Sequence, residues 1–400
     1  MCDNHSSKDD THNPGRRALL AGSVASLGGL TVAGLAQAQE TAATGAVVET
    51  GPTRVTAWAA SAVGGPFGAI EIPRRAMGPS DVVLEVLYSG ICHSDIHAVN
   101  ADWGQPNLPL VPGHEIIGRV VAVGDAVTKF RVGDIGGVGC MVESCGECAN
   151  CAADREQNCL NGTTFTYDSP SKIEGGALTH GGYSQRMVVT EHFVIRIPPG
   201  MDLAAAAPLL CAGVTTFSPL RHWNVQPGWR VGVIGVGGLG HMAIKLAVAH
   251  RAEVTAFTTS PGKLEAIADL GATEAVLWDN AGRMGELAGQ FDLLISTVPV
   301  SYAMDPFMAL LKLDGTLVNV GALGQLEGLN GMAQGFGRKS LAGSMIGGIA
   351  ETQAMIDYCA ARGIAADVEL IAPDQITEAY ARVQDKDVRY RFVIDVAGQG

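Results

Sequence analysis

The sequence predicts an α/β protein in which a mostly β domain precedes a doubly wound parallel sheet of six strands. Between about residues 53 and 197, short runs of β-forming residues are broken by glycine and proline, as in a compact β domain. Beyond Pro198-Pro199-Gly200, β runs alternate with helical stretches, which is typical of parallel strands joined by crossover helices. A glycine-rich turn, Gly235-x-Gly237-x-x-Gly240, joins the first of these later strands to a helix.

The composition of the 400-residue chain is that of a folded protein with a large core. Hydrophobic residues make up 47% of the chain and charged residues 17%, which argues against disorder. The net charge of −13 and the lack of a basic cluster disfavour nucleic acid as a partner. Beyond the leader we see no charge-free run of about 18 apolar residues, so no membrane-spanning helix is expected.

The first 38 residues resemble an export signal. Arg16-Arg17 precede a stretch without charged residues, 18–38, which ends in the small-x-small pattern Ala36-Gln37-Ala38. Its mild hydrophobicity suits a twin-arginine signal better than a membrane anchor. We therefore expect a periplasmic protein; the alternative is a non-functional, disordered leader on a cytoplasmic one.

Two domains are expected after the leader. The first spans 53–212 and is completed by the tail, 346–400, which is too short to fold alone and holds one helical run (352–362) and one strand (391–396). The second spans 213–345. Its six strands are the number found in a dinucleotide-binding sheet, and we place them at 230–235, 254–258, 274–277, 292–296, 316–320 and 340–345.

The glycine-rich turn is expected to hold the phosphates of a dinucleotide. Gly235 allows a tight turn, Gly237 lets the backbone approach the pyrophosphate, and Gly240 lets the helix pack on the strand. Gly238 and Leu239 begin that helix, so its N-terminus faces the phosphates. The strand-turn-helix context makes this match more specific than the glycine pattern alone.

The end of the next strand indicates the type of cofactor. NAD-binding enzymes usually have an acidic residue there, which binds the ribose hydroxyls. This chain has Thr258-Thr259-Ser260 instead, with Lys263 close behind. Hydroxyls and an ammonium suit a 2′-phosphate, so NADP(H) is favoured over NAD(H), and a cluster of helix-capping hydroxyls is the alternative.

Four cysteines form a loop of the type that binds a structural metal ion. Cys145, Cys148, Cys151 and Cys159 follow the spacing Cys-x2-Cys-x2-Cys-x7-Cys. Four thiolates this close in sequence can surround one zinc ion tetrahedrally and leave no open position. An iron–sulfur cluster or disulfides are the competing interpretations.

A second set of metal-binding side chains is dispersed along the chain. Cys92, His114 and Cys211, with Glu115 beside His114, offer two thiolates, an imidazole and a carboxylate. A Cys2His set with an open fourth position is typical of catalytic zinc in alcohol dehydrogenases. Taken singly, each cysteine is more often a small buried residue, and the histidine a turn or core residue.

These motifs together resemble the zinc-containing medium-chain dehydrogenase/reductase superfamily, and most of all its cinnamyl-alcohol-dehydrogenase branch of NADP-dependent aldehyde reductases. The resemblance runs from about residue 53 to the end and implies a GroES-like catalytic domain with a Rossmann domain. Besides the four-cysteine loop, it rests on Gly-Ile-Cys-His-Ser-Asp (90–95), Val-Pro-Gly-His-Glu (111–115), Gly-Gly-Tyr-Ser (181–184), Pro-Leu-Leu-Cys-Ala-Gly-Val-Thr (208–215), Gly-Val-Gly-Gly-Leu-Gly (235–240) and Gly-Ser-Met-Ile-Gly-Gly (343–348).

The resemblance implies roles around the catalytic zinc. Cys92, His114 and Cys211 would hold the ion, and Glu115 would approach it when water or substrate leaves. Asp95 would accept a hydrogen bond from the far nitrogen of His114 and fix its tautomer. The remaining two residues would form a proton relay, in which Ser94 takes the proton of the substrate hydroxyl and passes it to His97 at the surface.

The resemblance also implies contacts to cofactor and substrate. His93 matches a position that contacts the pyrophosphate, and Trp103 is expected to wall the substrate pocket, with a core residue as the alternative. The other positions that match cofactor-lining residues are Thr215, Thr297, Gly321, Ser344 and Ile346.

The expected reaction is the reversible oxidation of a primary alcohol to an aldehyde, with the cofactor favouring aldehyde reduction. Two zinc ions, NADP(H), a small-molecule substrate and a homodimer are expected. A zinc-independent reductase of the same superfamily would lack the ligands, which are all present. A non-catalytic exported binding protein would have lost Ser94 and His97, which are also present.

Overall fold

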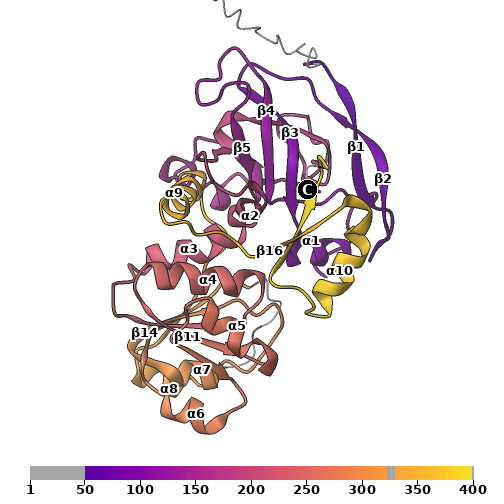
Figure 1. Ribbon diagram of the computed structural model, residues 1–400. Coiled ribbons are helices and arrows are strands. Elements are labelled where there is room, and N and C mark those ends of the chain that lie inside the picture. Colours follow the sequence, from indigo (N-terminus) through magenta and orange to yellow (C-terminus); the bar gives the residue numbers. More distant parts are fainter. Residues whose placement is uncertain (1–49, 322–325, 327–328, 399–400) are drawn as a thin grey trace, which may run out of the picture. The chain divides into compact units, whose positions relative to one another are not determined.

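Two large sheets carry the fold, a mixed sheet of seven strands and a parallel sheet of six (Figure 1). The structure is a computed structural model that describes residues 50–321, 326 and 329–398. Both sheets belong to one unit, Val48–Gly400. The predicted fold class, a mostly β part followed by a doubly wound parallel sheet, is confirmed.

The seven-stranded sheet is built around β3 (Asp81–Gly90), which pairs antiparallel with three strands. Valine and leucine dominate β3, and nearly all its residues are buried, as expected for a central strand. Its partners are β4 (Ile116–Val123), β8 (Arg186–Thr190) and β17 (Arg391–Asp395), and the outer strands are β5 (Ile135–Val138), β9 (Val194–Arg196) and β16 (Val368–Ile371).

Two small hairpins extend this half. The longer one pairs β1 (Thr53–Ala60) with β2 (Phe67–Arg74) in register over eight residues. Isolated β-bridges join this hairpin to other segments of the chain, from Ala57 to Ser184 and from Ala60 to Leu110. The shorter one pairs β6 (Met141–Glu143) with β7 (Thr164–Phe165) and spans the four-cysteine loop.

The parallel sheet has the strand order of a dinucleotide-binding fold. Counted from its first strand the order is 3-2-1-4-5-6, so the direction in which strands are added to the sheet reverses beside β10 (Arg230–Ile234). The other strands are β11 (Glu253–Thr258), β12 (Glu274–Leu277), β13 (Phe291–Ser296), β14 (Leu311–Asn319) and β15 (Ser340–Gly343). The strand expected at 316–320 begins five residues earlier, because β14 follows directly on a helix and bulges against β13.

Helices connect and cover the strands (Figure 1). Those of the parallel sheet are α4 (Gly238–Ala249), α5 (Leu264–Asp269), α6 (Ala281–Glu286), α7 (Asp305–Leu310) and α8 (Gly331–Phe336), with the short 3-10 helix η5 (Pro261–Lys263) before α5. The others are α1 (His93–Val99), α2 (Leu203–Ala206), η4 (Ala207–Leu210), α3 (Ala212–His222), α9 (Ile349–Ala360) and α10 (Ile376–Gln384).

The C-terminal tail lies in the seven-stranded sheet. β17 is fully buried and pairs with the end of β3, where Val393 faces Gly90. This pairing brings the first residue of β17, Arg391, beside the segment that follows β3. The expected helix at 352–362 is found as α9, which begins three residues earlier.

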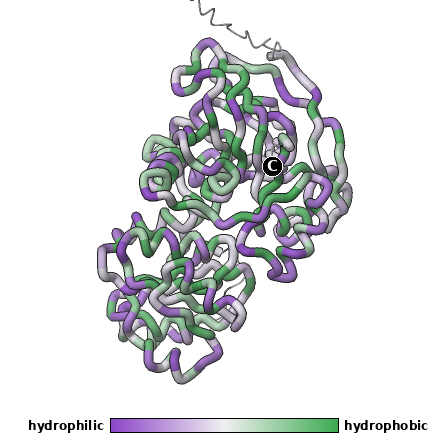
Figure 2. Tube along the Cα trace, viewed as in Figure 1, coloured by the Kyte–Doolittle hydropathy of each residue, from purple (hydrophilic) through white to green (hydrophobic). Residues whose placement is uncertain are grey.

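The core is apolar and follows the strands, and hydrophilic residues are frequent in the outer turns (Figure 2). Among the described residues, no single helix has the length and hydropathy to cross a membrane, although one bent pair, 203–210 with 212–222, passes that test by length and composition.

Candidate active site

Four buried side chains from three parts of the chain meet at one point. Cys92 caps α1 directly after β3, His114 and Glu115 precede β4, and Cys211 lies between η4 and α3. One ligand atom from each lies within 4.8 Å of the others. The two sulfurs are 3.9 Å apart, close to the 3.8 Å or so that a tetrahedral zinc ion with Zn–S bonds of about 2.3 Å requires.

Asp95 organises this group from behind. Its carboxylate accepts hydrogen bonds from His114 Nδ1 (2.9 Å), from the backbone nitrogen of Cys92 (2.9 Å) and from that of Gly113 (3.1 Å). Burial is the largest single influence and lowers the pKa of His114, but the charges of Asp95 and Cys140 and the hydrogen bonds to Asp95 and Cys92 together raise it well above its usual value. With Nδ1 engaged, Nε2 is the nitrogen left to bind a metal ion.

Glu115 is fully buried, and its charged partner is Arg391 from the C-terminal tail. Arg391 Nη2 lies 3.3 Å from Glu115 Oε1, and Nη1 donates to the carbonyl of Ile91 at 3.0 Å. Burial raises the pKa of Glu115 to about 8 although Arg391 lowers it. Gly90 leaves room for this carboxylate, since a Cβ there would overlap its Oε2 atom.

Arg391 also reaches the nucleotide-binding turn. A Cβ at Gly238, the first residue of α4, would overlap the guanidinium of Arg391. The same cation therefore lies between the metal-ligand set and the helix N-terminus expected to face the pyrophosphate. Sequence reasoning missed Arg391, because no local pattern around it indicates which buried groups it meets.

The four cysteines of the loop form a second cluster. Their sulfurs lie within 4.8 Å of one another, with Cys148 and Cys151 3.5 Å apart. These distances exclude disulfides, whose sulfurs are about 2.05 Å apart. Backbone N–H groups of Cys151 and Leu160 point at the Cys148 sulfur and lower the pKa of its thiol to about 6, which favours the metal-binding thiolate.

The residues of the expected relay lie on α1 beside the first cluster. Ser94 Oγ is 3.7 Å from the Cys92 sulfur. His97 Nδ1 is 2.7 Å from Asp102 Oδ2, while His97 Nε2 is buried without a partner in the described structure. No hydrogen bond between Ser94 and His97 is found among these described residues. Trp103 is 55% exposed and its ring is 5.1 Å from that of His97, so the core alternative does not hold.

Asp102 is a second residue that sequence reasoning missed. Asp102 lies beyond the end of α1 and five residues after its partner His97, which is inside the helix, so helical spacing gives no signal for the pair. The chain turns back after Val99, with Ala101 in a left-handed conformation (φ 63°), and this turn brings Asp102 to His97.

The glycine-rich turn has the geometry expected of it. Gly235 has φ 85°, a Cβ at Gly240 would overlap the carbonyl of Gly235, and Gly237 has open space around it. Thr297 Oγ1 donates to the Gly235 carbonyl at 2.9 Å. These contacts close the helix on the strand and leave the turn open where a phosphate would approach.

The other residues expected at the cofactor follow the carboxyl ends of the parallel strands, where ligands bind in such sheets. Thr297 follows β13, Gly321 follows β14, and Ser344 and Ile346 follow β15. Ile346 has φ 56°, a strained conformation for a β-branched residue and one that clusters at functional sites. Outside the sheet, Thr215 is buried in α3 and Leu239 lies in α4.

The hydroxyl cluster after β11 divides into two kinds of residue. Thr258, the last residue of β11, is buried and accepts a hydrogen bond from the backbone nitrogen of Ser260 at 3.1 Å, which is a local turn contact and not a helix cap. Thr259 is exposed and Ser260 half-buried. Lys263 donates to the carbonyl of Val236 in the glycine-rich turn at 3.0 Å. The cation and the phosphate-binding turn are thus adjacent.

Comparison with known proteins identifies the family. The chain matches the family "Alcohol dehydrogenase GroES-like domain" over residues 78–199 and "Zinc-binding dehydrogenase" over 238–361. It is 50% identical to NADP-dependent alcohol dehydrogenase C 1 of Mycolicibacterium smegmatis over 86% of this chain and 98% of that protein. It is 52% identical to the aldehyde reductase YahK of Escherichia coli K12 over 82% and 95%.

Solved structures of cinnamyl alcohol dehydrogenases are also similar to this chain. A cinnamyl alcohol dehydrogenase of Sorghum bicolor is 42% identical with a TM-score of 0.84, covering 87% of this chain and 99% of that one. One from Helicobacter pylori, solved with NADP(H), is 36% identical with a TM-score of 0.81, covering 87% and 100%. The chain belongs to the cinnamyl-alcohol-dehydrogenase-like branch of the zinc-containing medium-chain dehydrogenases.

The prediction of a periplasmic location for this dehydrogenase was wrong. The matched relatives in Escherichia coli, Bacillus subtilis and M. smegmatis are cytoplasmic enzymes, so the comparison gives no support for export. The prediction depended on residues 1–38, which lie outside the described part of the chain. A weakly apolar stretch after two arginines is compatible with export but is not specific to it.

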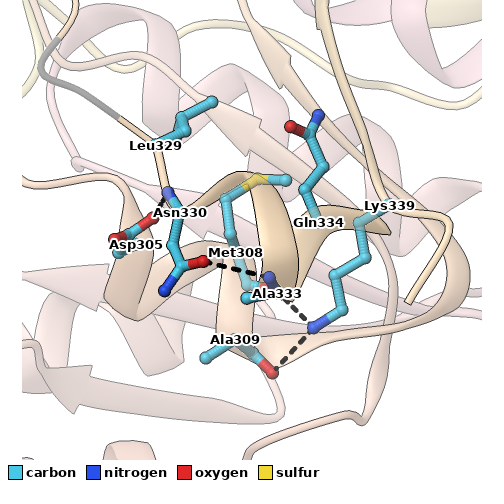
Figure 3. A pocket seen from close by; sticks show the side chains of 8 residues that line it. All are labelled: Asp305, Met308, Ala309, Leu329, Asn330, Ala333, Gln334 and Lys339. Atoms are coloured by element: carbon cyan, nitrogen blue, oxygen red, sulfur yellow. Dashed lines mark hydrogen bonds between the residues drawn. The ribbon is translucent and has the colours of Figure 1, made fainter. Parts of the chain in front are cut away.

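A separate small cavity of about 110 Å³ lies between α7 and α8 of the dehydrogenase (Figure 3). Asp305 accepts a hydrogen bond from the backbone nitrogen of Asn330, and Lys339 donates to the carbonyl of Met308. These bonds close the ends of short helices. None of the residues proposed for catalysis or cofactor binding lines this cavity, so we leave it outside the active site.

Proposed function

We propose that the chain is a zinc-dependent oxidoreductase that interconverts primary alcohols and aldehydes with NADP(H), and that it chiefly reduces aromatic or aliphatic aldehydes. The observation that carries this proposal is the buried group of Cys92, His114, Glu115 and Cys211, joined through Arg391 to the nucleotide-binding turn. Named relatives at about 50% identity are dehydrogenases and reductases, which disfavours a binding protein without turnover.

Two zinc sites fit the donor sets of the chain. Cys92, His114 and Cys211, with Glu115 as a fourth group, would hold the catalytic ion, and Cys145, Cys148, Cys151 and Cys159 the structural one. Glu115 supports the first assignment, because both its oxygens are buried without a hydrogen bond in the described structure. Bound zinc would polarise the substrate oxygen.

Protein groups would move the proton. Ser94, next to the ligand Cys92, is the group placed to exchange a proton with the substrate oxygen. Asp102 fixes the His97 ring through Nδ1 and leaves Nε2 as the atom that would exchange the proton. Because Ser94 and His97 are not directly bonded, one bridging hydroxyl group or water molecule must complete the path.

The cofactor would lie along the carboxyl edge of the parallel sheet. The turn 235–240 and Arg391 would bind the pyrophosphate, with His93 nearby on α1. Thr259, Ser260 and Lys263 would bind the 2′-phosphate. Thr215, Thr297, Gly321, Ser344 and Ile346 would surround the nicotinamide end, and Trp103 would wall the substrate pocket.

A homodimer that pairs through β15 is part of the proposal. β15 is the edge strand of the parallel sheet, and among the described residues β14 is the one strand that pairs with it, so its outer side is the edge on which a second copy would pair. Exposed apolar side chains lie beside this edge, with Met345 68% and Phe336 82% exposed.

The proposed activity is tested with the purified protein and a Cys211→Ser variant. We expect NADPH oxidation on addition of benzaldehyde by the wild-type protein and a loss of at least about a hundredfold in the variant, since one thiolate ligand is replaced. A variant that keeps its turnover would remove Cys211 from the reaction.

A further inference from the structure

Three cations from distant parts of the chain meet beyond the end of β11. Lys263 closes η5, whereas Lys386 and Arg389 lie in the turn between α10 and β17. The Arg389 guanidinium donates from Nη2 to the carbonyl oxygen of Gly262 at 3.2 Å. This contact joins the C-terminal turn to the loop that would hold the adenosine end of the cofactor.

No ion pair offsets the positive charge of this group among the described residues, and Glu369 Oε1 accepts only from the backbone nitrogen of Arg389, at 3.0 Å. In residues 50–321, 326 and 329–398, no carboxylate lies within 4.0 Å of the charged atoms of Lys263, Lys386 or Arg389. The carboxylates of Asp387 and Glu369 instead pair with Arg382, each at 3.0 Å. Burial and the charges of Lys386 and Arg389 lower the pKa of Lys263, as expected where cations crowd together without an anion.

Arg389 and Arg391 contact the two places where a bound dinucleotide carries phosphate. Arg391 lies against Gly238 at the start of α4, where the pyrophosphate is expected, and Arg389 lies against Gly262, after the strand that meets the adenosine ribose. Residues 389–391, at the start of β17, thus lie along the position expected for the bound cofactor.

We propose that the turn at 385–390 completes the 2′-phosphate site, with Arg389 and Lys386 binding the phosphate opposite Lys263. The inference rests on the proposed NADP(H)-dependent function and adds a source of cofactor specificity from outside the parallel sheet. A phosphate monoester carries about −1.5 to −2 charges at neutral pH and suits a guanidinium fork. The 2′-hydroxyl of NADH offers these cations no charge.

Arg389→Gln and Lys386→Asn test the proposal in the full-length, zinc-loaded protein. Asparagine tolerates the left-handed backbone of Lys386 (φ 62°), so this variant loses charge without new strain. We expect the KM for NADPH to rise about tenfold in Arg389→Gln and severalfold in Lys386→Asn. The KM for NADH and kcat at saturating NADPH should stay within about twofold of wild type.

Arg54→Gln is a matched control, because exposed Arg54 likewise donates one guanidinium hydrogen bond to a backbone carbonyl, that of Glu71 at 3.0 Å. It should leave both KM values unchanged. As a second measurement, inhibition by adenosine 2′,5′-bisphosphate should weaken in Arg389→Gln while inhibition by 5′-AMP does not change. Equal rises in the KM for NADPH and NADH would show that Arg389 only supports the loop, and this result, or no rise at all, would overturn the proposal.

Lys263→Ala separates this inference from the proposed function. Suppose that Lys263→Ala removes the preference for NADPH and that neither Arg389→Gln nor Lys386→Asn weakens this preference. The 2′-phosphate site after β11 is then supported, and only the proposed role of the turn at 385–390 is contradicted. If wild-type protein shows no preference for NADPH at all, the proposed cofactor is wrong and the inference fails with it.

Discussion

Asp95 connects three elements of the metal-ligand set through hydrogen bonds. It binds the ring of His114 and the backbone nitrogens of Cys92 and Gly113, and none of its surface is exposed. The carboxylate therefore fixes both the tautomer of one ligand and the backbone that carries another. A residue with these contacts controls zinc affinity without touching the ion.

Replacing Asp95 by asparagine should weaken zinc binding at the catalytic site. The amide keeps the size of the side chain, but its NH2 group cannot accept hydrogen bonds as the carboxylate does. We expect a loss of about 10- to 100-fold in zinc affinity or turnover. Zinc retained after dialysis against a chelator, with kcat measured in parallel, checks this. Asp134→Asn, a change at an exposed turn carboxylate, is the control and should retain both. Equal zinc retention and kcat in Asp95→Asn and wild type would count against the role of Asp95.

Asp102→Asn tests the relay at the same scale. Because Asp102 would hold the His97 ring and orient its free Nε2 atom, its loss should lower kcat by about tenfold or more, with little change in the KM for NADPH. His97→Gln should lower kcat at least as much. Steady-state kinetics at neutral pH decides this, and a kcat unaffected by both variants would exclude His97 as a proton carrier.

At the scale of elements, a thiol of the four-cysteine loop and a thiol of α9 should differ in reactivity. Backbone N–H groups lower the pKa of Cys148 to about 6, so most of this thiol is ionised at pH 7.5 once zinc is removed. Burial raises the pKa of Cys359 in α9 to about 12, so this thiol stays protonated at that pH. We expect iodoacetamide to alkylate Cys148 first and Cys359 only after unfolding, as followed by peptide mass spectrometry. Rapid labelling of Cys359 in the folded protein would contradict the buried position of α9.

A second element-scale prediction concerns α4 and the C-terminal tail. His241 in α4 is fully buried, stacks on Tyr390 at 4.9 Å between ring centroids and accepts a long hydrogen bond of 3.4 Å from the backbone nitrogen of Asp367. Burial first, and then the charge of Arg391, lower the pKa of His241 from 6.5 to about 3. Its neutral form is therefore the one compatible with the fold.

The unfolded chain binds a proton at His241 below about pH 6.5, whereas the folded chain does so only near pH 3. Stability from this group is thus present above pH 6.5 and is lost as pH falls towards 3. Between pH 6.5 and 5 the loss should approach about 2 kcal/mol. Urea unfolding of wild type and His241→Gln over this range checks it, and the variant should show the weaker pH dependence. Parallel curves for the two proteins would exclude His241 as the source.

At the scale of the whole molecule, the sequence predicts best what local patterns encode. The glycine-rich turn, the four-cysteine loop and the alternation of strand and helix each have a spacing that follows from geometry, and the family and the strand order agree with them. The dispersed set of Cys92, His114 and Cys211 has no such spacing and was predicted from its occurrence together with the other motifs. Arg391 and Asp102 escaped prediction because their partners are set by tertiary contacts. Arg391 meets Glu115 only because β17 pairs with β3, and no pattern near residue 391 encodes that pairing.

The location was the one contradicted prediction, and it too concerns the whole molecule. Two arginines and an uncharged stretch describe a composition, and composition fixes neither a structure nor a destination. The metal ligands differ in this respect, because four thiolates at short spacing have few structures open to them other than a metal site.

The most direct test of the account is zinc content measured together with NADPH-dependent reduction of cinnamaldehyde or benzaldehyde by the purified protein. We predict close to two zinc ions per chain, with turnover that chelation abolishes and added zinc restores. Two zinc ions without turnover would leave both metal sites standing but contradict the proposed reaction. Turnover that persists after all zinc is removed would contradict the central claim that the Cys92, His114 and Cys211 site carries the chemistry.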